Sequence, residues 1–374
     1  MSAVDSVLIT PTPKPKYFFE NGLRKIEPYY HLNKTFVKGR WVNKTLLEIF
    51  KAEFKSYYDL DYLLNKKNSY RVIRRQRNNE IISGLKLIDL KLNHGDLVEN
   101  IQHKHEPPVK YNDKIKIIFE DEFLLVIDKP SGIPVHSTKN YYYNTIIEIL
   151  KNEYNYKNLY PLHRLDKLTS GILILSKNNS KNSYYQDLFK AKQENQVIKE
   201  YIAKVDGKFP YNQFLCQDDI IQIDFHKSFN ECGIKNPKKS STLFEFLQYD
   251  HNMNQSLLRC KPLTGRTHQI RIHLKKIGFP IVNDPLYGKN GLLNEIQDLK
   301  EIDEIKFNNC IEILHSKIDN LMLDETNNCK ECGIYAYKDP DINNLFICLH
   351  SQVYNFPNIN LFFKSDLPEW ALIE

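Results

Sequence analysis

The spacing of hydrophobic residues changes along the chain. In residues 44–64 the apolar side chains recur at helical spacing, at Leu46, Leu47, Ile49, Phe50 and Phe54. Residues 70–108 instead hold short apolar runs, which are broken by turn residues such as Gly95 and Asp96. These patterns predict a small module of helix and short strands over 44–109, with Pro107 and Pro108 as the linker that leaves it.

From residue 114 onward the pattern is that of strands. Apolar runs at 115–119 and 123–127 flank an acidic turn and predict a hairpin. Further strands are expected at 171–176, 200–205, 241–249 and 256–261, with helical stretches between some of them. Because no regular βαβ rhythm connects these runs, the sequence favours an α+β fold with a mixed or antiparallel sheet over 110–374.

Residues 1–43 have a different character. The opening, 1–16, is rich in Pro, Thr and Ser and predicts a flexible tail that lacks the features of a targeting helix. Aromatic and basic residues then alternate up to Trp41, as they do where bases stack and phosphates are neutralised. The alternative is that these aromatic residues cap the hydrophobic core.

Charge is distributed unevenly between the two parts. The formal net charge is +6, and residues 1–110 hold 20 Lys and Arg against 12 Asp and Glu, which leaves 32 against 34 in the rest. A basic module joined to a nearly neutral one indicates a part that grips a polyanion and a part with another role. A solvated basic face would give the same counts.

Cysteine usage and hydropathy bear on the compartment. The seven cysteines show no regular framework spacing, and the start of the chain has no apolar signal segment, which indicates a reducing intracellular compartment. No stretch is long and apolar enough to span a bilayer, so no membrane partner is expected. We predict a cytoplasmic monomer, with a nuclear or mitochondrial pool left open.

Three polar clusters lie where apolar strands are expected to begin or end, the usual place for function on a rigid scaffold. The first, HRLDKLTSG at 163–171, places Asp166 at the mouth of the next strand. The second, KEYIAKVDG at 199–207, places Tyr201 on a strand face. The third, PLTGRTHQIRIHL at 262–274, is a glycine turn that enters a helix.

A carboxylate, a phenol and an arginine in one pocket suit a reaction on a flat heterocycle. The aromatic ring holds the base by stacking, and the arginine keeps the carboxylate ionised through a charge-assisted hydrogen bond. A structural Asp–Arg ion pair beside a core tyrosine would use the same residues.

Read in order, the three clusters resemble three motifs of the RluA-type pseudouridine synthase family. With DKPSG at 128–132, NDPLYG at 283–288 and LHS at 349–351, the resemblance extends over about 114–370. The N-terminal YFFENGLRKIEPYY and GDLVENIQHKHEPPV are further similar to the fungal branch that modifies tRNA anticodon stem-loops. RNA, and tRNA in particular, is therefore the expected partner.

The resemblance assigns roles to individual residues. It implies that Asp166 is the catalytic carboxylate, that Tyr201 contacts the flipped uracil and that Arg271 pairs with the aspartate. Arg164 would enter the RNA stack where the target base leaves it. Arg266, in the same motif as Arg271, is an RNA-binding candidate, and sequence alone does not orient the two arginines.

The module at 44–109 loosely resembles an S4-type RNA-binding domain, through its Gly-Asp ending and the arginines before it. We expect this arginine cluster to contribute salt-dependent affinity without selecting the site of modification. The cluster consists of Arg71, Arg74, Arg75 and Arg77. A plain small α+β domain is the alternative.

The family's reaction breaks the N1–C1′ bond of uridine and rejoins the base through C5, without net redox change, so no cofactor is expected. Asp166 would either attack the nucleotide or remove a proton from its sugar. Cys329 and Cys332 form a CxxC pair that Cys310 or His350 could complete as a zinc site. Two reduced cysteines near a turn explain the pair more simply, and no metal is assigned.

The sequence argues against two other classes of protein. A fused zinc deaminase needs His-x-Glu followed by Pro-Cys-x-x-Cys, and neither element is present. A ribosome-associated S4 protein would not need so long a second domain. The main alternative is a non-catalytic RNA-binding or chaperone protein that retains the synthase fold. Residues 290–341, which are rich in Asn and acidic residues, match little and predict a surface excursion.

Overall fold

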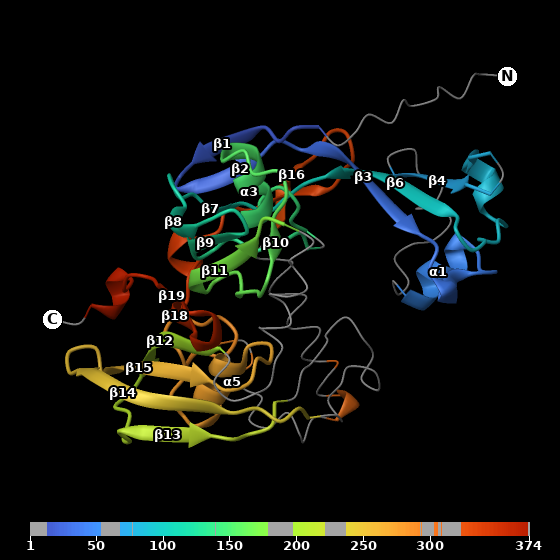
Figure 1. Ribbon diagram of the computed structural model, residues 1–374. Coiled ribbons are helices and arrows are strands. Elements are labelled where there is room, and N and C mark those ends of the chain that lie inside the picture. The colour runs from blue at the N-terminus through green and yellow to red at the C-terminus, as the bar shows by residue number, and fades with distance from the viewer. Residues whose placement is uncertain are drawn as a thin grey trace. The chain divides into compact units, whose positions relative to one another are not determined.

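The protein divides into two compact units. The computed structural model describes residues 13–53, 68–76, 78–138, 140–178, 197–220, 237–291, 293, 303–305, 308 and 323–372 (Figure 1). The smaller unit comprises 1–18, 26–106 and 324–337, and the larger unit comprises 19–25, 107–323 and 338–374. The boundary predicted from the sequence lies at 109/110, with 26–43 in the N-terminal extension and 324–337 in the main domain. The predicted and observed divisions therefore differ at these segments.

The smaller unit is built on an antiparallel sheet in the order β3-β6-β4-β5. Its strands are β3 (Tyr29–Phe36), β6 (Leu97–Lys104), β4 (Asn68–Arg74) and β5 (Glu80–Ser83). The short helices η1 (Gly39–Trp41) and η2 (Gly84–Leu87) and the hairpin of β16 (Leu323–Asn328) and β17 (Tyr335–Tyr337) accompany it. The S4-like character of this unit stays a prediction.

Helix α1 (Leu46–Glu53) covers the sheet of the smaller unit. A capping box starts it, because the Thr45 hydroxyl accepts from the Glu48 amide at 3.2 Å while the Glu48 carboxylate accepts from the Thr45 amide at 2.7 Å. Its apolar stripe packs on Val72 and Val98. The helix predicted over 44–64 is thus confirmed from Leu46 to Glu53. Residues 44 and 45 precede the helix, and the prediction for 54–64 lies outside the described residues.

Some of the alternating aromatic and basic residues near the N-terminus are buried and others are exposed. Trp41 is buried in the core of the smaller unit. Arg24 is only 3% exposed and forms a bidentate ion pair with Glu153. Phe18 and Phe19 are exposed. Part of the pattern is therefore structural, as the core-capping interpretation held, and part stays on the surface.

The larger unit contains a ten-stranded mixed sheet, in the order β13-β14-β15-β12-β18-β11-β9-β8 with β10 on β11 and β19 on β18. Every pair is antiparallel except β11 and β18. The strands are β8 (Lys116–Glu120), β9 (Leu124–Lys129), β10 (Tyr160–Pro161), β11 (Ser170–Ser176), β12 (Ile198–Asp206), β13 (Gln213–Cys216), β14 (Thr242–Asp250), β15 (Gln255–Pro262), β18 (Leu349–Phe356) and β19 (Leu361–Lys364). The predicted hairpin and the four further strands are confirmed.

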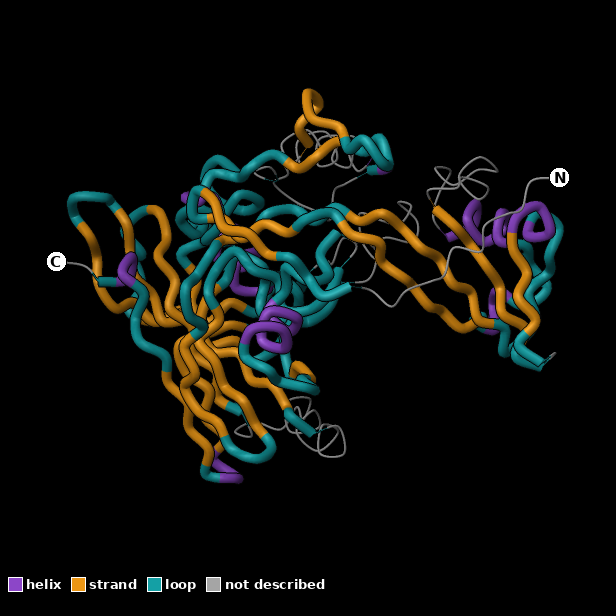
Figure 2. The backbone as a smooth tube through the Cα atoms, turned by 90° about the horizontal axis from the view of Figure 1, so that it is seen from above, coloured by secondary structure: helices purple, strands orange, loops and turns teal. Residues whose placement is uncertain are grey.

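Two further groups of elements are short. One is a small sheet of β1 (Tyr17–Glu20), β2 (Leu23–Ile26) and β7 (Val109–Lys110), and the other is the helices η4 (Ile342–Asn344), η5 (Pro357–Ile359) and η6 (Glu369–Ala371). Figure 2 shows that strands and loops dominate and that helices are short. None of the helices in the described part of the chain is long and apolar enough to cross a membrane.

Two helices cover different parts of the large sheet. Helix α3 (Ile146–Glu153) packs on β9 and β11, and α5 (Gln269–Lys276) packs on β12, β14 and β15. Strand β11 is buried on both sides, because Leu173 and Leu175 face one cluster while Ile172 and Ile174 face another. This explains why its sequence is a continuous apolar run instead of an alternating one.

Candidate active site

Asp166 lies in a tight turn directly before β11. The Thr169 amide donates to the Asp166 carbonyl at 3.2 Å, which closes the turn. Gly171 follows with φ of +104°, and a Cβ at this position would come within 2.2 Å of the Ser351 carbonyl oxygen. The glycine therefore lets β11 approach β18 closely, and the carboxylate lies at the entrance to the parallel pair.

Arg271, in the first turn of α5, joins two carboxylates. Its Nη1 donates to Asp166 Oδ2 at 2.8 Å. Its Nε and Nη2 donate to the two oxygens of Asp284 at 2.7 and 2.8 Å. The Arg271 and Asp284 side chains are 4% and 0% exposed, whereas that of Asp166 is 20% exposed. The bidentate pair fixes the guanidinium, and the guanidinium in turn holds the one carboxylate that solvent can reach.

Positive charge around Asp166 keeps it ionised. Burial alone would raise the pKa of the Asp166 carboxyl, but the charges of protonated His268, Arg271 and Arg164 outweigh it and hold that pKa below its usual value. Burial lowers the pKa of His268 itself, so at neutral pH the two arginines supply the positive charge. Burial also opposes the charge of Arg271, yet the hydrogen bond to Asp284 raises the pKa of the guanidinium. At neutral pH the site therefore presents a carboxylate, able to act as a nucleophile or base.

Tyr201 lies on β12, which β18 separates from β11, the strand that follows the Asp166 turn. On β12 it pairs with Ser351 of β18, next to a register shift between Glu200 and Tyr201. Burial raises the pKa of its phenol, and Asp166 adds to this shift through its charge. The Tyr201 side chain is thus a neutral phenol at physiological pH, within the electrostatic reach of the carboxylate.

A chain of hydrogen bonds orients the phenol. His163 Nε2 accepts from the Ile174 amide at 3.2 Å, so in the neutral ring the proton lies on Nδ1. That Nδ1 is 3.1 Å from the Tyr354 hydroxyl, which is 3.3 Å from the Tyr201 hydroxyl. In this arrangement His163 donates to the Tyr354 hydroxyl, and Tyr354 donates to the Tyr201 hydroxyl. Tyr201 can therefore donate its own proton to a ligand.

The partly buried His163 predicts a loss of stability in mild acid. Burial lowers the pKa of His163 from 6.5 to about 3. Between these values the unfolded chain binds a proton that the folded chain does not, so the free energy of unfolding falls as pH decreases below about 6.5. From pH 7 to pH 5 we expect this residue to cost on the order of 2 kcal/mol.

Urea denaturation at both pH values checks this expectation. His163→Gln keeps a hydrogen-bonding amide but cannot titrate, so its pH dependence should be shallower than that of the wild type by the stated amount. Other buried histidines are the same in both proteins and cancel. Equal pH dependence in the two proteins would contradict the assignment.

The predicted arginines occupy distinct places. Arg164 is exposed and close enough to Asp166 to lower the pKa of its carboxyl. Arg266 lies before α5, where its Nε donates to the Lys239 carbonyl at 3.2 Å. Arg271 and not Arg266 is thus the arginine that contacts Asp166 in the structure.

The arginine cluster of the smaller unit is only partly available to a ligand. Arg71 forms an ion pair with the buried carboxylate of Glu99. Arg74 donates to the Lys91 carbonyl at 2.8 Å. Arg75 is exposed, with its guanidinium 5.5 Å from the centre of the Phe36 ring. Arg77 lies outside the described residues.

Sequence reasoning missed several groups at the site. Asp284, within the NDPLYG motif, was given no role, although its carboxylate also accepts from the Leu286 and Tyr287 amides at 2.9 and 3.0 Å. His268 Nε2 lies 3.6 Å from Asp166, and its Nδ1 lies 3.1 Å from the Tyr287 hydroxyl. The signal for both was available, because each lies in a motif already singled out.

Lys129 was also missed. It is fully buried and its ammonium donates to the Pro130 and Lys167 carbonyls at 2.8 and 3.2 Å. Burial lowers the pKa of Lys129 to about 7, although Asp166 opposes the shift. The lysine ties the DKPSG loop to the turn that carries Asp166.

Comparison with known proteins decides the family. The sequence matches the profile of RNA pseudouridylate synthase over residues 123–276. It is 36% identical to the Saccharomyces cerevisiae protein named tRNA pseudouridine(31) synthase, over 96% of this chain and 97% of that protein. The chain belongs to the RNA pseudouridylate synthase family. The resemblance drawn from the motifs is confirmed, and Asp166, Tyr201 and Arg271 all lie within the matched region.

Two further relatives extend the comparison. The synthase is 34% identical to the S. cerevisiae protein named tRNA pseudouridine(32) synthase, mitochondrial, over 96% of this chain and 79% of that protein. It is 32% identical to the Arabidopsis thaliana protein named RNA pseudouridine synthase 7, over 88% of this chain and 82% of that protein. The similarity therefore includes the smaller unit and is not confined to the residues around Asp166.

Proposed function

We propose that this synthase converts uridine to pseudouridine in the anticodon stem-loop of tRNA, with Asp166 as the catalytic carboxylate. The observation that carries the proposal is the ion-pair network in which Arg271 hydrogen-bonds to both Asp284 and Asp166. It ends in the partly exposed, ionised carboxylate of Asp166. The substrate class rests on relatives whose names specify tRNA and which align with nearly the whole chain.

Asp166 acts on the sugar side of the nucleotide. In one route its carboxylate attacks the nucleotide, and in the other it removes a proton from the sugar as the N1–C1′ bond breaks. In both routes the uracil rotates and C5 bonds to C1′, as the carboxylate leaves C1′ in the first route or returns the proton to the sugar in the second. The C5 proton is then released and N1 takes up a proton, so the product is an isomer of uridine. The ion pair with Arg271 suits either route, because it keeps the carboxylate deprotonated and pointed into the open side of the site.

Tyr201 contacts the flipped base, and Arg164 takes its place in the RNA stack. The target nucleotide must leave its stack before the uracil can rotate, at a cost of roughly a few kcal/mol. Arg164, exposed beside Asp166, offsets part of that cost by filling the vacated space. The Tyr201 ring supports the flipped uracil, and its free proton suits a uracil carbonyl, an acceptor that is present throughout the reaction.

Site-resolved pseudouridine mapping on total tRNA tests the function. We compare cells that contain the native protein, cells that lack it and cells that carry Asp166→Ala. Loss of the same one or few pseudouridines in both altered strains is the expected result. If every site persisted with Asp166→Ala while deletion changed RNA levels or folding, the non-catalytic RNA-binding function would replace this proposal.

Arg75 is the proposed phosphate contact of the smaller unit, since its guanidinium is exposed while Arg71 is paired with Glu99. Arg75→Ala should weaken tRNA binding and reduce the slope of log affinity against log salt by about 0.7 to 0.9, the share of one phosphate contact. Fluorescence anisotropy with labelled tRNA over a range of salt concentrations measures both quantities.

Arg71→Ala is the matched control for that measurement. Removing Arg71 leaves Glu99, whose side chain is 2% exposed, with Lys34 as its remaining partner at 3.0 Å, so stability should suffer more than the salt slope. An unchanged salt slope in Arg75→Ala, Arg266→Ala and Arg164→Ala alike would remove these residues from the RNA-binding surface.

The cytosol is the proposed compartment, and a monomer is the proposed state.

A further inference from the structure

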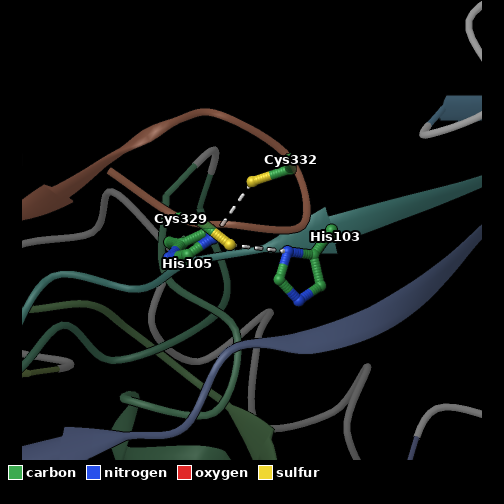
Figure 3. A group of neighbouring side chains, drawn as sticks. All are labelled: His103, His105, Cys329 and Cys332. Carbon is green, nitrogen blue, oxygen red and sulfur yellow. Dashed lines mark hydrogen bonds between the residues drawn. The ribbon is translucent and has the colours of Figure 1, made fainter. Parts of the chain in front are cut away.

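The smaller unit holds a cluster of four side chains with the donor atoms that zinc prefers. His103 lies at the end of β6 and His105 follows directly after that strand, while Cys329 and Cys332 come from the turn between β16 and β17 (Figure 3). Their ligand atoms all lie within 4.8 Å of one another. Neither of the two cysteines forms a disulfide, and His103 is buried.

The distances fit a tetrahedral ion. His103 Nδ1 is 3.6 Å from Cys329 Sγ, and His105 Nε2 is 3.3 Å from Cys332 Sγ. A zinc ion with bonds of about 2.3 Å to sulfur and about 2.0 Å to nitrogen separates its ligand atoms by roughly 3.3 to 3.8 Å. Both of these pairs already have this separation, and the other ligand atoms, which all lie within 4.8 Å of one another, need only move closer together to coordinate one ion.

Local backbone structure directs each pair of ligands to one side. Residues 103 and 105 are two apart at the end of a strand, so their side chains point to the same face. In the hairpin turn the Cys329 amide donates to the Ile334 carbonyl and the Gly333 amide donates to the Cys329 carbonyl, both at 2.8 Å. Gly333 has φ of +73°, which lets the chain turn back directly after the second cysteine.

Neighbouring groups complete the arrangement around the ligands. The backbone amides of Cys332 and Glu331 hydrogen-bond to the Cys329 thiol. Glu331 Oε2 lies 3.6 Å from His103 Nε2, the ring nitrogen that faces away from the sulfur, and accepts from the Tyr30 hydroxyl at 2.9 Å. A carboxylate on the outer nitrogen of a histidine fixes the tautomer in which the inner nitrogen carries a lone pair for a metal.

We propose that His103, His105, Cys329 and Cys332 bind one zinc ion in a Cys2His2 site. Four protein ligands leave no open coordination position, so the ion has a structural role and takes no part in the reaction at Asp166. It joins β6 to a hairpin that lies 226 residues further along the chain. The mixed nitrogen and thiolate set favours zinc over magnesium or calcium, which bind oxygen.

This site differs from the ligand sets considered from the sequence. Cys310 lies outside the described residues. His350 belongs to the larger unit and its two ring nitrogens lie 2.8 Å from the Ser170 hydroxyl and 3.1 Å from the Ser365 hydroxyl. No metal was expected from the sequence, because no local pattern links the CxxC pair to the HKH segment at 103–105, which lies at the end of β6.

Metal analysis of the full chain, purified under reducing conditions without chelators, tests the proposal. We expect close to one zinc per chain in the wild type and in Asp166→Ala. Cys329→Ser combined with Cys332→Ser should lose the zinc, while Cys348→Ser, which changes a buried cysteine of the larger unit, should retain it. Zinc in Asp166→Ala makes the result independent of whether the proposed catalysis is correct.

A second measurement on the wild type avoids any doubt about misfolded variants. Replacement of zinc by Co²⁺ should give the visible bands of a tetrahedral ion with thiolate ligands, and chelation should increase hydrogen exchange in residues 97–105 and 323–337. A wild-type chain that binds no zinc after reconstitution, or zinc content unchanged by the double serine variant, would overturn the proposal.

Discussion

Purified Asp166→Asn is expected to form pseudouridine about 10⁴-fold more slowly than the wild type, or not measurably. The amide has nearly the same shape as the carboxylate and can still accept from Arg271 Nη1, so the fold and the RNA contacts should survive. What it loses is the negative charge, and without it neither attack on the nucleotide nor removal of a sugar proton is possible. Single-turnover release of the C5 hydrogen as tritium measures the rate.

Two controls make that result specific. Asp113→Asn removes an exposed carboxylate of the same unit and should leave the rate unchanged. The dissociation constant of Asp166→Asn for tRNA, measured by anisotropy, should match that of the wild type. Turnover near the wild-type rate in Asp166→Asn would show that another group performs the chemistry.

The second large effect concerns stability. Asp284→Ala should lower the free energy of unfolding by about 3 to 5 kcal/mol, because it leaves the Arg271 charge buried without its bidentate partner. The Asp166 carboxylate supplies only a single hydrogen bond to Nη1 and does not replace the two that are lost. The Leu286 and Tyr287 amides lose their acceptor as well. Urea denaturation measures the loss.

A double variant separates stability from activity. Arg271→Met with Asp284→Leu removes both charges and keeps side-chain volume, so it should be less destabilised than Asp284→Ala alone. It should nevertheless be inactive, since the guanidinium that hydrogen-bonds to the Asp166 carboxylate and lowers its pKa is then absent. If Asp284→Ala were as stable as the wild type, the ion pair would have no structural role.

Sequence patterns located the strands of the site well. The apolar run after HRLDKLTSG predicted β11, and this alone placed Asp166 at the start of a strand. The prediction succeeded because β11 is buried on both sides, which leaves its sequence unambiguous.

The choice between two arginines was beyond the sequence. Arg266 and Arg271 share one motif, and their positions depend on where the helix begins. His268 has φ of +56°, so the chain turns sharply just before α5, and only Arg271 lies on the helix. A left-handed residue that is not glycine leaves no reliable pattern.

Tyr201 shows the same limit in a strand. The register shift between Glu200 and Tyr201 sets which partner on β18 the tyrosine faces, and a shift of one residue reverses the face of a strand. Alternation in the sequence cannot reveal such a shift. Likewise, the partners of Cys329 and Cys332 lie more than 200 residues away and share no local signal with them.

The division of the chain also bears on how the protein is made. The smaller unit takes its segments from 1–18, 26–106 and 324–337, so its last piece is synthesised only after the whole stretch 107–323. At the usual rate of translation this interval lasts roughly ten to forty seconds. During that time the nascent N-terminal module lacks the hairpin of β16 and β17, and chaperones can bind the surface that this hairpin later covers.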